Sequence, residues 1–348
     1  MSSLISIPAS NSTVSVSILN VASVNVPAFP FLHPVPPGHE RLVAPVFTFL
    51  IEHPNKNRKI MFDLGLRKRL EESAPAFLDN WSQPGGMKAD VEKDVATRLK
   101  EGGVDLGSVD TIIWSHSHID HTGDPSTFPS TTELVIGPGT KEAFFPPYPE
   151  GPNSPLLASN FEGRKVTELN PEQFTLTIGG FKALDYFGDG SLYLLDTPGH
   201  CPGHITGLAR VTITPLTFIL MGGDTSHHPG QFRPSVHIPC PCSLLSGVSH
   251  EHFPHAQTTS DVTKPLLTIP LSELSVYADA PRATESIEKL SAFDAHPDIL
   301  VLLAHDSSMQ DAIRYFPEKA NAWKEMGWKE KRWAFLEKGS RAWRFAPA

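Results

Sequence analysis

A short segment of the chain concentrates side chains that bind metal ions. Within Trp114–Asp124, WSHSHIDHTGD, six consecutive residues include His116, His118, Asp120 and His121. In an extended backbone His116 and His118 project to the same side, and Asp120 and His121 follow where the chain must turn. Imidazole nitrogens and carboxylate oxygens are suitable zinc ligands. Four ligands are more than one ion usually takes from so short a segment, which favours two metal ions ~3.5–4 Å apart.

Three further candidate ligands occupy corresponding places elsewhere in the chain. Each lies just beyond a short apolar run, within five residues of its end, of the kind that forms a buried strand. Loops after such strands gather at one edge of a sheet, where sites are commonly built. The candidates and the runs before them are His200 after Leu192–Leu195, Asp224 after Phe218–Met221, and His305 after Ile299–Leu303.

The elements that must position these residues are mostly short strands. Alternating residues predict a strand over Val14–Val26, and the polar turn EHPNKNR predicts a hairpin between Val46–Ile51 and Lys59–Phe62. Short apolar runs predict further strands at Thr111–Trp114, Leu134–Ile136, Phe174–Ile178, Phe181–Tyr186, Leu192–Leu195, Thr206–Ile213, Phe218–Met221 and Ile299–Leu303. Helices are predicted at Met87–Lys100, Ser286–Phe293 and Asn321–Leu336. Strands outnumber helices and the two are mixed, which favours an α+β sandwich of sheets flanked by helices.

The motifs resemble those of a known family. HSHIDH matches the His-x-His-x-Asp-His signature of the metallo-β-lactamase superfamily, and Asp63 of FDLG, His200, Asp224 and His305 follow its order. The resemblance implies an αββα sandwich with two mixed β-sheets and a single domain over residues 1–348. Its core would span about 13–310, with a long insertion at about 227–280 before the last ligand strand. A helical extension would follow at 311–348.

The resemblance also implies a role for each candidate residue. The first of two divalent metal ions would be bound by His116, His118 and His200, and the second by Asp120, His121 and His305. Asp224 would bridge both ions. Asp63 would lie outside the ligand set and hold the histidine loop by hydrogen bonds. For His204, a supporting role beside the site is favoured over metal ligation. Zinc is the expected metal, and iron or manganese also suit these ligands.

Two such ions imply hydrolysis by a bridging hydroxide, because a bound divalent metal lowers the pKa of water to about 7. Asp120 is the candidate for moving the proton. The motif DTPGHCPGH resembles the TPGHxPGH of quorum-quenching lactonases, which open acyl-homoserine lactones. GDPSTFP resembles fungal members of that branch, some of which are proposed to open lactam rings of plant defence compounds. The expected enzyme therefore opens a lactone or lactam.

The sequence departs from the lactonase pattern after the bridging aspartate. A tyrosine expected three residues later is replaced by His227. His227 and His228 could contact the substrate carbonyl or leaving group, or they could cap a loop. Phe232 and Tyr148 are candidates for an apolar pocket wall, although such aromatics can also be loop anchors. The insertion itself could be a lid or a disordered segment.

Composition restricts the remaining possibilities. The 348 residues carry a net charge of −9, and no basic stripe indicates a nucleic-acid partner. No apolar run is long enough for a membrane helix, and the start of the chain has no signal-peptide pattern. Three cysteines are too few for a disulfide framework, so a cytoplasmic protein with a small-molecule substrate is expected. Oligomeric state is not predicted.

Other functions of the same fold remain alternatives. A thioesterase of the glyoxalase II or polyketide-releasing type would use the same hydroxide, and the basic group RKR at 67–69 could then help to dock a carrier protein. A flavin-dependent oxidoreductase would need an additional domain for which the chain has no room. Complete ligand sets make a non-catalytic metal-binding protein the weakest of these alternatives.

Overall fold

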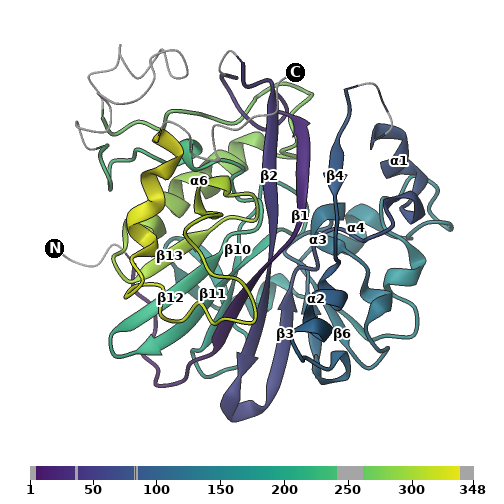
Figure 1. Ribbon diagram of the computed structural model, residues 1–348, viewed down its shortest axis with the longest axis horizontal. Coiled ribbons are helices and arrows are strands. Elements are labelled where there is room, and N and C mark those ends of the chain that lie inside the picture. Colours follow the sequence, from purple (N-terminus) through teal and green to yellow (C-terminus); the bar gives the residue numbers. More distant parts are fainter. Residues whose placement is uncertain (1–4, 36–37, 82, 84, 241–261, 338–348) are drawn as a thin grey trace.

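The computed structural model describes residues 5–35, 38–81, 83, 85–240 and 262–337. Two β-sheets pack face to face, and helices cover their outer faces (Figure 1). The first sheet has the strand order β4-β1-β2-β3-β5-β6-β7. Its strands are β1 (Ser15–Pro27), β2 (Arg41–His53), β3 (Arg58–Phe62), β4 (Lys88–Asp90), β5 (Thr111–Ile113), β6 (Glu133–Ile136) and β7 (Val166–Glu168).

The second sheet has the order β13-β12-β11-β10-β9-β8. Its strands are β8 (Leu176–Ile178), β9 (Phe181–Asp185), β10 (Leu192–Asp196), β11 (Ile205–Ile213), β12 (Leu216–Met221) and β13 (Ile299–Leu302). The helices are α1 (Pro75–Trp81), α2 (Val95–Glu101), α3 (Ile119–Thr122), α4 (Thr140–Phe144) and α6 (Ala280–Ala295). Short 3-10 helices occur at Pro54–Lys56, Leu70–Glu72, Leu106–Ser108, Pro125–Thr127, Ala158–Asn160, Pro171–Gln173, Pro229–Gln231, Ser307–Met309 and Trp328–Leu336.

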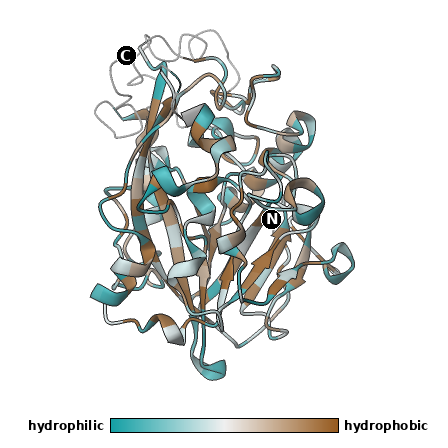
Figure 2. Ribbon diagram, turned by 90° about the vertical axis from the view of Figure 1, so that its right-hand side faces the viewer, coloured by the Kyte–Doolittle hydropathy of each residue, from teal (hydrophilic) through white to brown (hydrophobic). Residues whose placement is uncertain are grey.

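Three apolar layers explain the sandwich. Phe47 and Phe62 of the first sheet pack with Leu194 and Ile219 of the second in the central layer. A second layer lies between the first sheet and α2, and a third lies between the second sheet and α6. Because both faces of the central strands are buried, their sequences are almost continuously apolar. Figure 2 shows the strands as mainly hydrophobic and the peripheral loops as more hydrophilic.

This architecture confirms the predicted αββα class, but two local predictions need correction. Residues 87–100 do not form one helix: Lys88–Asp90 pairs with β1, and the helix begins only at Val95. The side chain of Asp94 accepts a hydrogen bond from Thr97 N at 2.8 Å and so caps the helix start. Pairing with the open edge of β1 overrides the four-residue apolar spacing.

The C-terminal prediction is also only partly right. In place of a helix over 321–336, a 3-10 helix spans Trp328–Leu336. Trp323 and Trp328 are buried in the central apolar layer, so this segment belongs to the core of the sandwich. Residues 338–348 of the predicted extension lie outside the described residues. Within the described part of the chain, no helix combines the length and apolar character needed to cross a membrane.

Parallel strand pairing brings the candidate ligands to one edge. Strands β3 and β5 pair in parallel with Phe62 opposite Ile113, so Asp63 and the histidine segment leave the sheet together. Strands β12 and β13 also pair in parallel, with Met221 opposite Leu302. The loops that carry Asp224 and His305 are therefore neighbours in the other sheet.

Candidate metal centre

The first donor set joins the histidine segment to the loop after β10. The Nε2 atom of His200 lies 3.2 Å from His116 Nε2 and 3.0 Å from His118 Nδ1. The donor atoms of these three histidines and Asp224 all lie within 4.8 Å of one another. Burial lowers the pKa of all three histidines, which favours the neutral imidazole that a metal ion requires.

Gly199 makes the close packing of this loop possible. Its φ is +126°, and a Cβ atom at this position would lie 2.1 Å from the backbone nitrogen of Ala283 in α6. Only glycine readily takes such a backbone conformation. The loop can therefore lie against the start of α6 while presenting His200 to the site.

The second donor set combines α3 with the loop after β13. Asp120, His121 and His305 provide donor atoms within 4.8 Å of one another. The Nε2 atom of His305 lies 3.3 Å from Asp120 Oδ2, and His121 Nε2 lies 3.9 Å from Asp120 Oδ1. The other ring nitrogen of His305 hydrogen-bonds to the carbonyl of Pro45 at 2.8 Å, which orients Nε2 towards the carboxylates.

The carboxylate of Asp224 lies between the two sets. Its Oδ2 atom is 3.7 Å from His116 Nε2 and 3.5 Å from His200 Nε2. Its Oδ1 atom is 3.2 Å from His121 Nε2 and 3.3 Å from His305 Nε2. One oxygen therefore faces each donor set.

Asp63 holds the histidine segment without facing either set. Its Oδ1 accepts a hydrogen bond from Ser115 N at 2.6 Å, and its Oδ2 accepts one from Ser115 Oγ at 2.8 Å. Oδ2 also lies 2.8 Å from His121 Nδ1. A carboxylate can only accept here, so His121 carries its proton on Nδ1 and directs the Nε2 lone pair to the site.

His204 performs a similar task for Asp224. Its Nδ1 lies 2.8 Å from Thr197 Oγ1 and 3.1 Å from the Thr197 carbonyl, and its Nε2 accepts a hydrogen bond from Asp224 N at 3.0 Å. Both ring nitrogens are thus engaged outside the donor sets. Burial lowers the pKa of His204 to about 3, so the ring stays neutral and Nε2 remains an acceptor.

The buried carboxylates require positive charge nearby. Burial alone would lower the pKa of His305, but Asp224 and Asp120 raise it to about 10. The pKa of His121 is raised in the same way by Asp224, Asp63 and Asp120, against the effect of burial. Burial would raise the pKa of Asp120, but His121 and His305 lower it to about 2. Protons on these histidines or metal ions can balance the carboxylates.

The donor chemistry fits metal ions. His121 Nε2 and Asp224 Oδ1 are both buried and have no hydrogen-bond partner of adequate geometry among the described residues. A buried nitrogen and oxygen left in this way are costly unless a cation binds them. Cys201 is not part of either donor set, and burial raises its pKa to about 12, which disfavours the thiolate needed for ligation.

Comparison with known proteins agrees with this geometry. The family model of the metallo-β-lactamase superfamily matches residues 41–305, which cover both sheets' ligand loops. The chain belongs to the metallo-β-lactamase superfamily. The predicted family and enzyme class, a metal-dependent hydrolase, are confirmed.

The proteins that are similar to this chain carry several different names. "Gamma-lactamase FDB1" of Fusarium pseudograminearum is 40% identical over 94% of this chain and 83% of its own length. "Cytochrome P450 monooxygenase mpaDE" of Penicillium roqueforti is 36% identical over 96% of this chain, which spans only 38% of that protein. A solved N-acyl homoserine lactone hydrolase with N-hexanoyl-L-homoserine bound covers 88% of this chain and 99% of its own. Its TM-score is 0.60 at 17% identity, which supports the fold alone.

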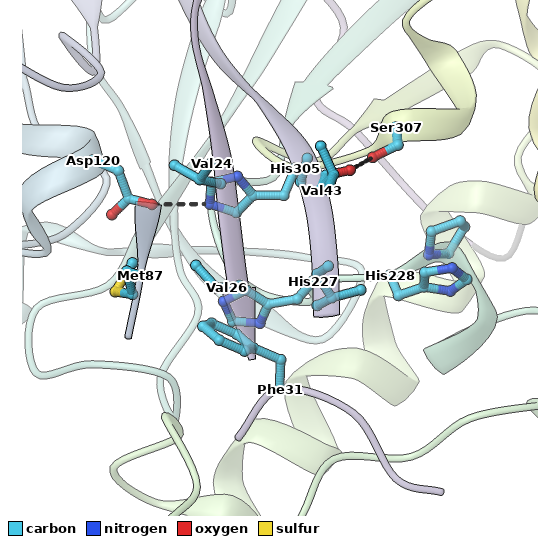
Figure 3. A pocket seen from close by; sticks show the side chains of 13 residues that line it. Val24, Val26, Phe31, Val43, Met87, Asp120, His227, His228, His305 and Ser307 are labelled. Carbon is cyan, nitrogen blue, oxygen red and sulfur yellow. Dashed lines mark hydrogen bonds and ion pairs between the residues drawn. The ribbon is translucent and has the colours of Figure 1, made fainter. Parts of the chain in front are cut away.

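In this metallo-β-lactamase domain a small cavity opens beside the second donor set. It holds about 30 Å³, space for roughly one water molecule. Figure 3 shows Asp120, His227 and His305 on its polar side. The other lining residues are mainly apolar and include Val24, Val26, Phe31, Leu42, Ala44 and Met87.

The two predicted substrate-contact histidines occupy different settings. His227 lines the cavity, and its ring lies 4.8 Å from that of Phe31. Its Nε2 is 3.1 Å from Asp224 Oδ2. His228 also lines the cavity, but its Nδ1 accepts a hydrogen bond from Gly230 N at 3.0 Å, which caps the turn at Pro229–Gln231. His228 thus fits the loop-capping alternative.

The predicted aromatic wall is placed elsewhere. Phe232 is buried in the layer under α6, with the guanidinium of Arg233 stacked 4.5 Å from its ring centre. Tyr148 bridges to Leu157 in the segment around residues 146–158, and it is not among the cavity-lining residues. The wall comes instead from the facing ends of β1 and β2. Residues 227–235 of the insertion are buried, whereas much of 262–280 is exposed, including Leu271 and Leu274. Residues 241–261 lie outside the described residues.

Proposed function

We propose that this protein opens the five-membered lactam or lactone ring of a small, largely apolar molecule, using two metal ions. The observation that carries the proposal is the position of Asp224, whose two oxygens face separate sets of buried donors. A carboxylate placed in this way can hold two ions at once. In related two-metal hydrolases the ions are roughly 3.5–4 Å apart.

The proposed ligands follow the two donor sets. His116, His118 and His200 would hold one ion, Asp120, His121 and His305 the other, and Asp224 both. Zinc is the preferred metal, because imidazole and carboxylate are its usual ligands, and iron or manganese would also be accepted. When bound, the ions supply a Lewis acid for the carbonyl and lower the pKa of water to about 7.

Asp120 is the proposed proton carrier. Its carboxylate borders the cavity, and its low pKa keeps it deprotonated and able to accept a proton at Oδ1 or Oδ2. Ring opening ends with a proton on the departing nitrogen or oxygen, and a carboxylate at the cavity wall can deliver one.

The cavity wall supports the substrate class. Apolar side chains such as Val24, Val26 and Met87 face the polar residues across a narrow space, which suits an apolar molecule that carries a single polar ring group. The named γ-lactamase among the relatives favours a cyclic amide as the first substrate to examine.

The experiment is proton release at constant pH from zinc-loaded protein. The panel contains an aryl γ-lactam, a cyclic carbamate, γ-lactones with short and long acyl chains, and two acyl thioesters. The Asp120→Asn variant serves as the blank, and we expect it to keep its fold and lose about 100-fold or more of the turnover. Ring opening much faster than thioester cleavage supports the proposal. Wild-type rates in Asp120→Asn would reject the mechanism.

The thioesterase alternative lacks an observation in its favour. Of the basic group at 67–69, Arg67 is buried and hydrogen-bonds to the carbonyl of Glu72 at 3.2 Å. Arg69 pairs with the carboxylate of Glu72 at 2.6 Å. Two of the three basic side chains are thus engaged within the chain. Fast thioester cleavage alone in the same panel would revive this alternative.

A further inference from the structure

Tyr277 is a residue of the site that no sequence motif indicated. It is contributed by the insertion, 53 residues after Asp224 in the chain, and it is 4% exposed. Its neighbours Ala278 and Asp279 donate backbone hydrogen bonds to the carbonyls of His200 and Gly199, at 3.0 and 2.9 Å. The tyrosine is therefore fastened directly to the loop that carries a proposed ligand.

The tyrosine hydroxyl belongs to a chain of polar contacts that ends at Asp224. It lies 2.7 Å from His227 Nδ1, and His227 Nε2 lies 3.1 Å from Asp224 Oδ2. A neutral imidazole has one N–H and one acceptor nitrogen. The ionised carboxylate can only accept, so the proton of His227 is on Nε2. Nδ1 is then an acceptor, and Tyr277 donates to it.

Among the residues that the structure describes, the hydroxyl has one other acceptor within reach, and it is less favourable. Gln231 Oε1 lies 3.4 Å from the Tyr277 oxygen, beyond the usual range for an O–H···O bond. That amide oxygen already accepts from Ser226 Oγ at 2.8 Å and from His227 N at 2.9 Å. The short contact to His227 therefore takes the tyrosine proton. Burial raises the pKa of Tyr277, so the proton is retained.

We propose that Tyr277 is a positioning residue that acts together with Asp224 to hold His227 as one tautomer: the hydroxyl donates to Nδ1, and Nε2–H is directed at Asp224. This inference rests on the proposed function only for its effect on turnover. His227 lines the cavity, so its Nε2–H is a donor suited to a carbonyl oxygen. With the opposite tautomer, a nitrogen lone pair would face the Asp224 carboxylate and any substrate oxygen.

The first test reads the tautomer directly in the zinc-loaded full-length protein. Two-bond nitrogen–proton NMR spectra of histidine-labelled protein distinguish a ring nitrogen that carries a proton from one that does not. The chain has 16 histidines, and the signal missing in His227→Gln identifies His227. We expect Nε2–H in wild type and a mixture, or Nδ1–H, in Tyr277→Phe. A wild-type Nδ1–H, or an unchanged tautomer in Tyr277→Phe, would overturn the inference.

The second test separates positioning from packing. Tyr277→Phe keeps the ring, whose centre is 5.3 Å from that of His200, and removes only the hydroxyl. We expect kcat to fall about 10- to 100-fold, as for other groups that orient residues of a metal site, with KM changed less than about twofold. Metal content should stay at the wild-type level.

The background variant His227→Gln provides the decisive comparison. A glutamine amide nitrogen always carries hydrogens, so it can donate to Asp224 whether or not the Tyr277 hydroxyl is present. Adding Tyr277→Phe to this variant should therefore lower kcat by less than about twofold. An equal loss in both backgrounds would show that the hydroxyl does not act through His227. Tyr193→Phe, which alters another buried tyrosine in the layer under α6, is the matched control and should keep wild-type kcat. If no substrate of the panel is turned over, the proposed function fails and the NMR test still decides this inference.

Discussion

At the scale of single residues, the site depends on hydrogen bonds that hold several imidazoles through the ring nitrogen that faces away from the donor sets. Asp63 contacts Nδ1 of His121, and the carbonyl of Pro45 contacts Nδ1 of His305. Thr197 contacts Nδ1 of His204. Each contact engages Nδ1 and so leaves Nε2 facing the donor sets or, for His204, the backbone nitrogen of Asp224. Two ligands of the second donor set, and the backbone of Asp224, are therefore preorganised by hydrogen bonds as well as by the fold.

His305 tests the assignment of the second set. His305→Ala should lower bound zinc from about two ions per chain towards one, because the first set keeps all its donors. Metal analysis after exhaustive dialysis gives the stoichiometry. His228→Ala is the control, since its ring caps a turn and faces neither set. Two ions retained in His305→Ala would contradict the assignment.

The motif residues could be predicted from sequence because spacing and residue type carry the information. HSHIDH, His200, Asp224 and His305 follow strands whose apolar runs are visible in the chain. Tyr277 could not be predicted in this way, because it lies in a segment without periodicity and reaches the site only through tertiary packing. Sequence alone likewise does not distinguish substrate contact from loop capping for His228, because tertiary packing sets its neighbours.

At the scale of elements, strand pairing determines the structure where the apolar periodicity of the sequence is ambiguous. The apolar spacing of residues 87–100 is compatible with a helix, yet Lys88–Asp90 completes the open edge of β1. Parallel pairing of β12 with β13 could not be inferred from either strand alone, although it sets Asp224 beside His305. The packing of the loop at Gly199 against α6 can be tested by substitution.

Gly199 provides one such test. Gly199→Ala places a methyl group against the backbone of Ala283 and strains a backbone with φ of +126°. We expect the free energy of unfolding to fall by about 1–3 kcal/mol, with reduced metal retention because His200 follows directly. Denaturant titration measures the stability. Gly188→Ala, also at positive φ but with open space around it, separates strain from the clash and should cost less.

The 3-10 helix Trp328–Leu336 gives a second test, through pH. Burial lowers the pKa of Lys329 to about 7, although Asp294 acts in the opposite direction, and the value in an unfolded chain is about 10.4. Between these values the unfolded state binds the proton and the folded state does not. Lys329 therefore makes stability rise with pH in this window, by up to about 1.4 kcal/mol per pH unit.

Lys329→Met should remove that contribution. Its free energy of unfolding should exceed that of wild type most near pH 7, with the difference shrinking as pH approaches about 9. Denaturant titrations of both proteins across this range provide the measurement. Parallel pH profiles for wild type and variant would mean that Lys329 keeps an ordinary pKa in the fold.

At the scale of the whole molecule, one buried ion pair joins three distant segments. Arg233 of the insertion donates to both carboxylate oxygens of Asp294 in α6, at 2.8 and 2.7 Å. It also donates to the carbonyl of Arg332 at 2.8 Å, in the C-terminal 3-10 helix. Arg233 therefore anchors the start of the insertion to α6 and to the C-terminal 3-10 helix.

Removing one partner of this pair should be severe. Arg233→Met leaves Asp294 buried without its main countercharge, and we expect a loss of about 3–5 kcal/mol in the free energy of unfolding. The double variant Arg233→Met with Asp294→Leu removes both charges and should recover much of that loss. Thermal and denaturant unfolding distinguish the two. Equal stability of the single and double variants would exclude an energetic role for the stranded carboxylate.

The narrow cavity beside Asp120 has a consequence for kinetics. The described residues leave space for roughly one water molecule beside Asp120, so a ring substrate would need wall residues such as Phe31 to move. Apparent affinity then equals the intrinsic affinity multiplied by the fraction of molecules that are open. Substitutions that change this population will alter KM without touching a ligand. Metal ligation and access to the cavity can then be altered by separate substitutions.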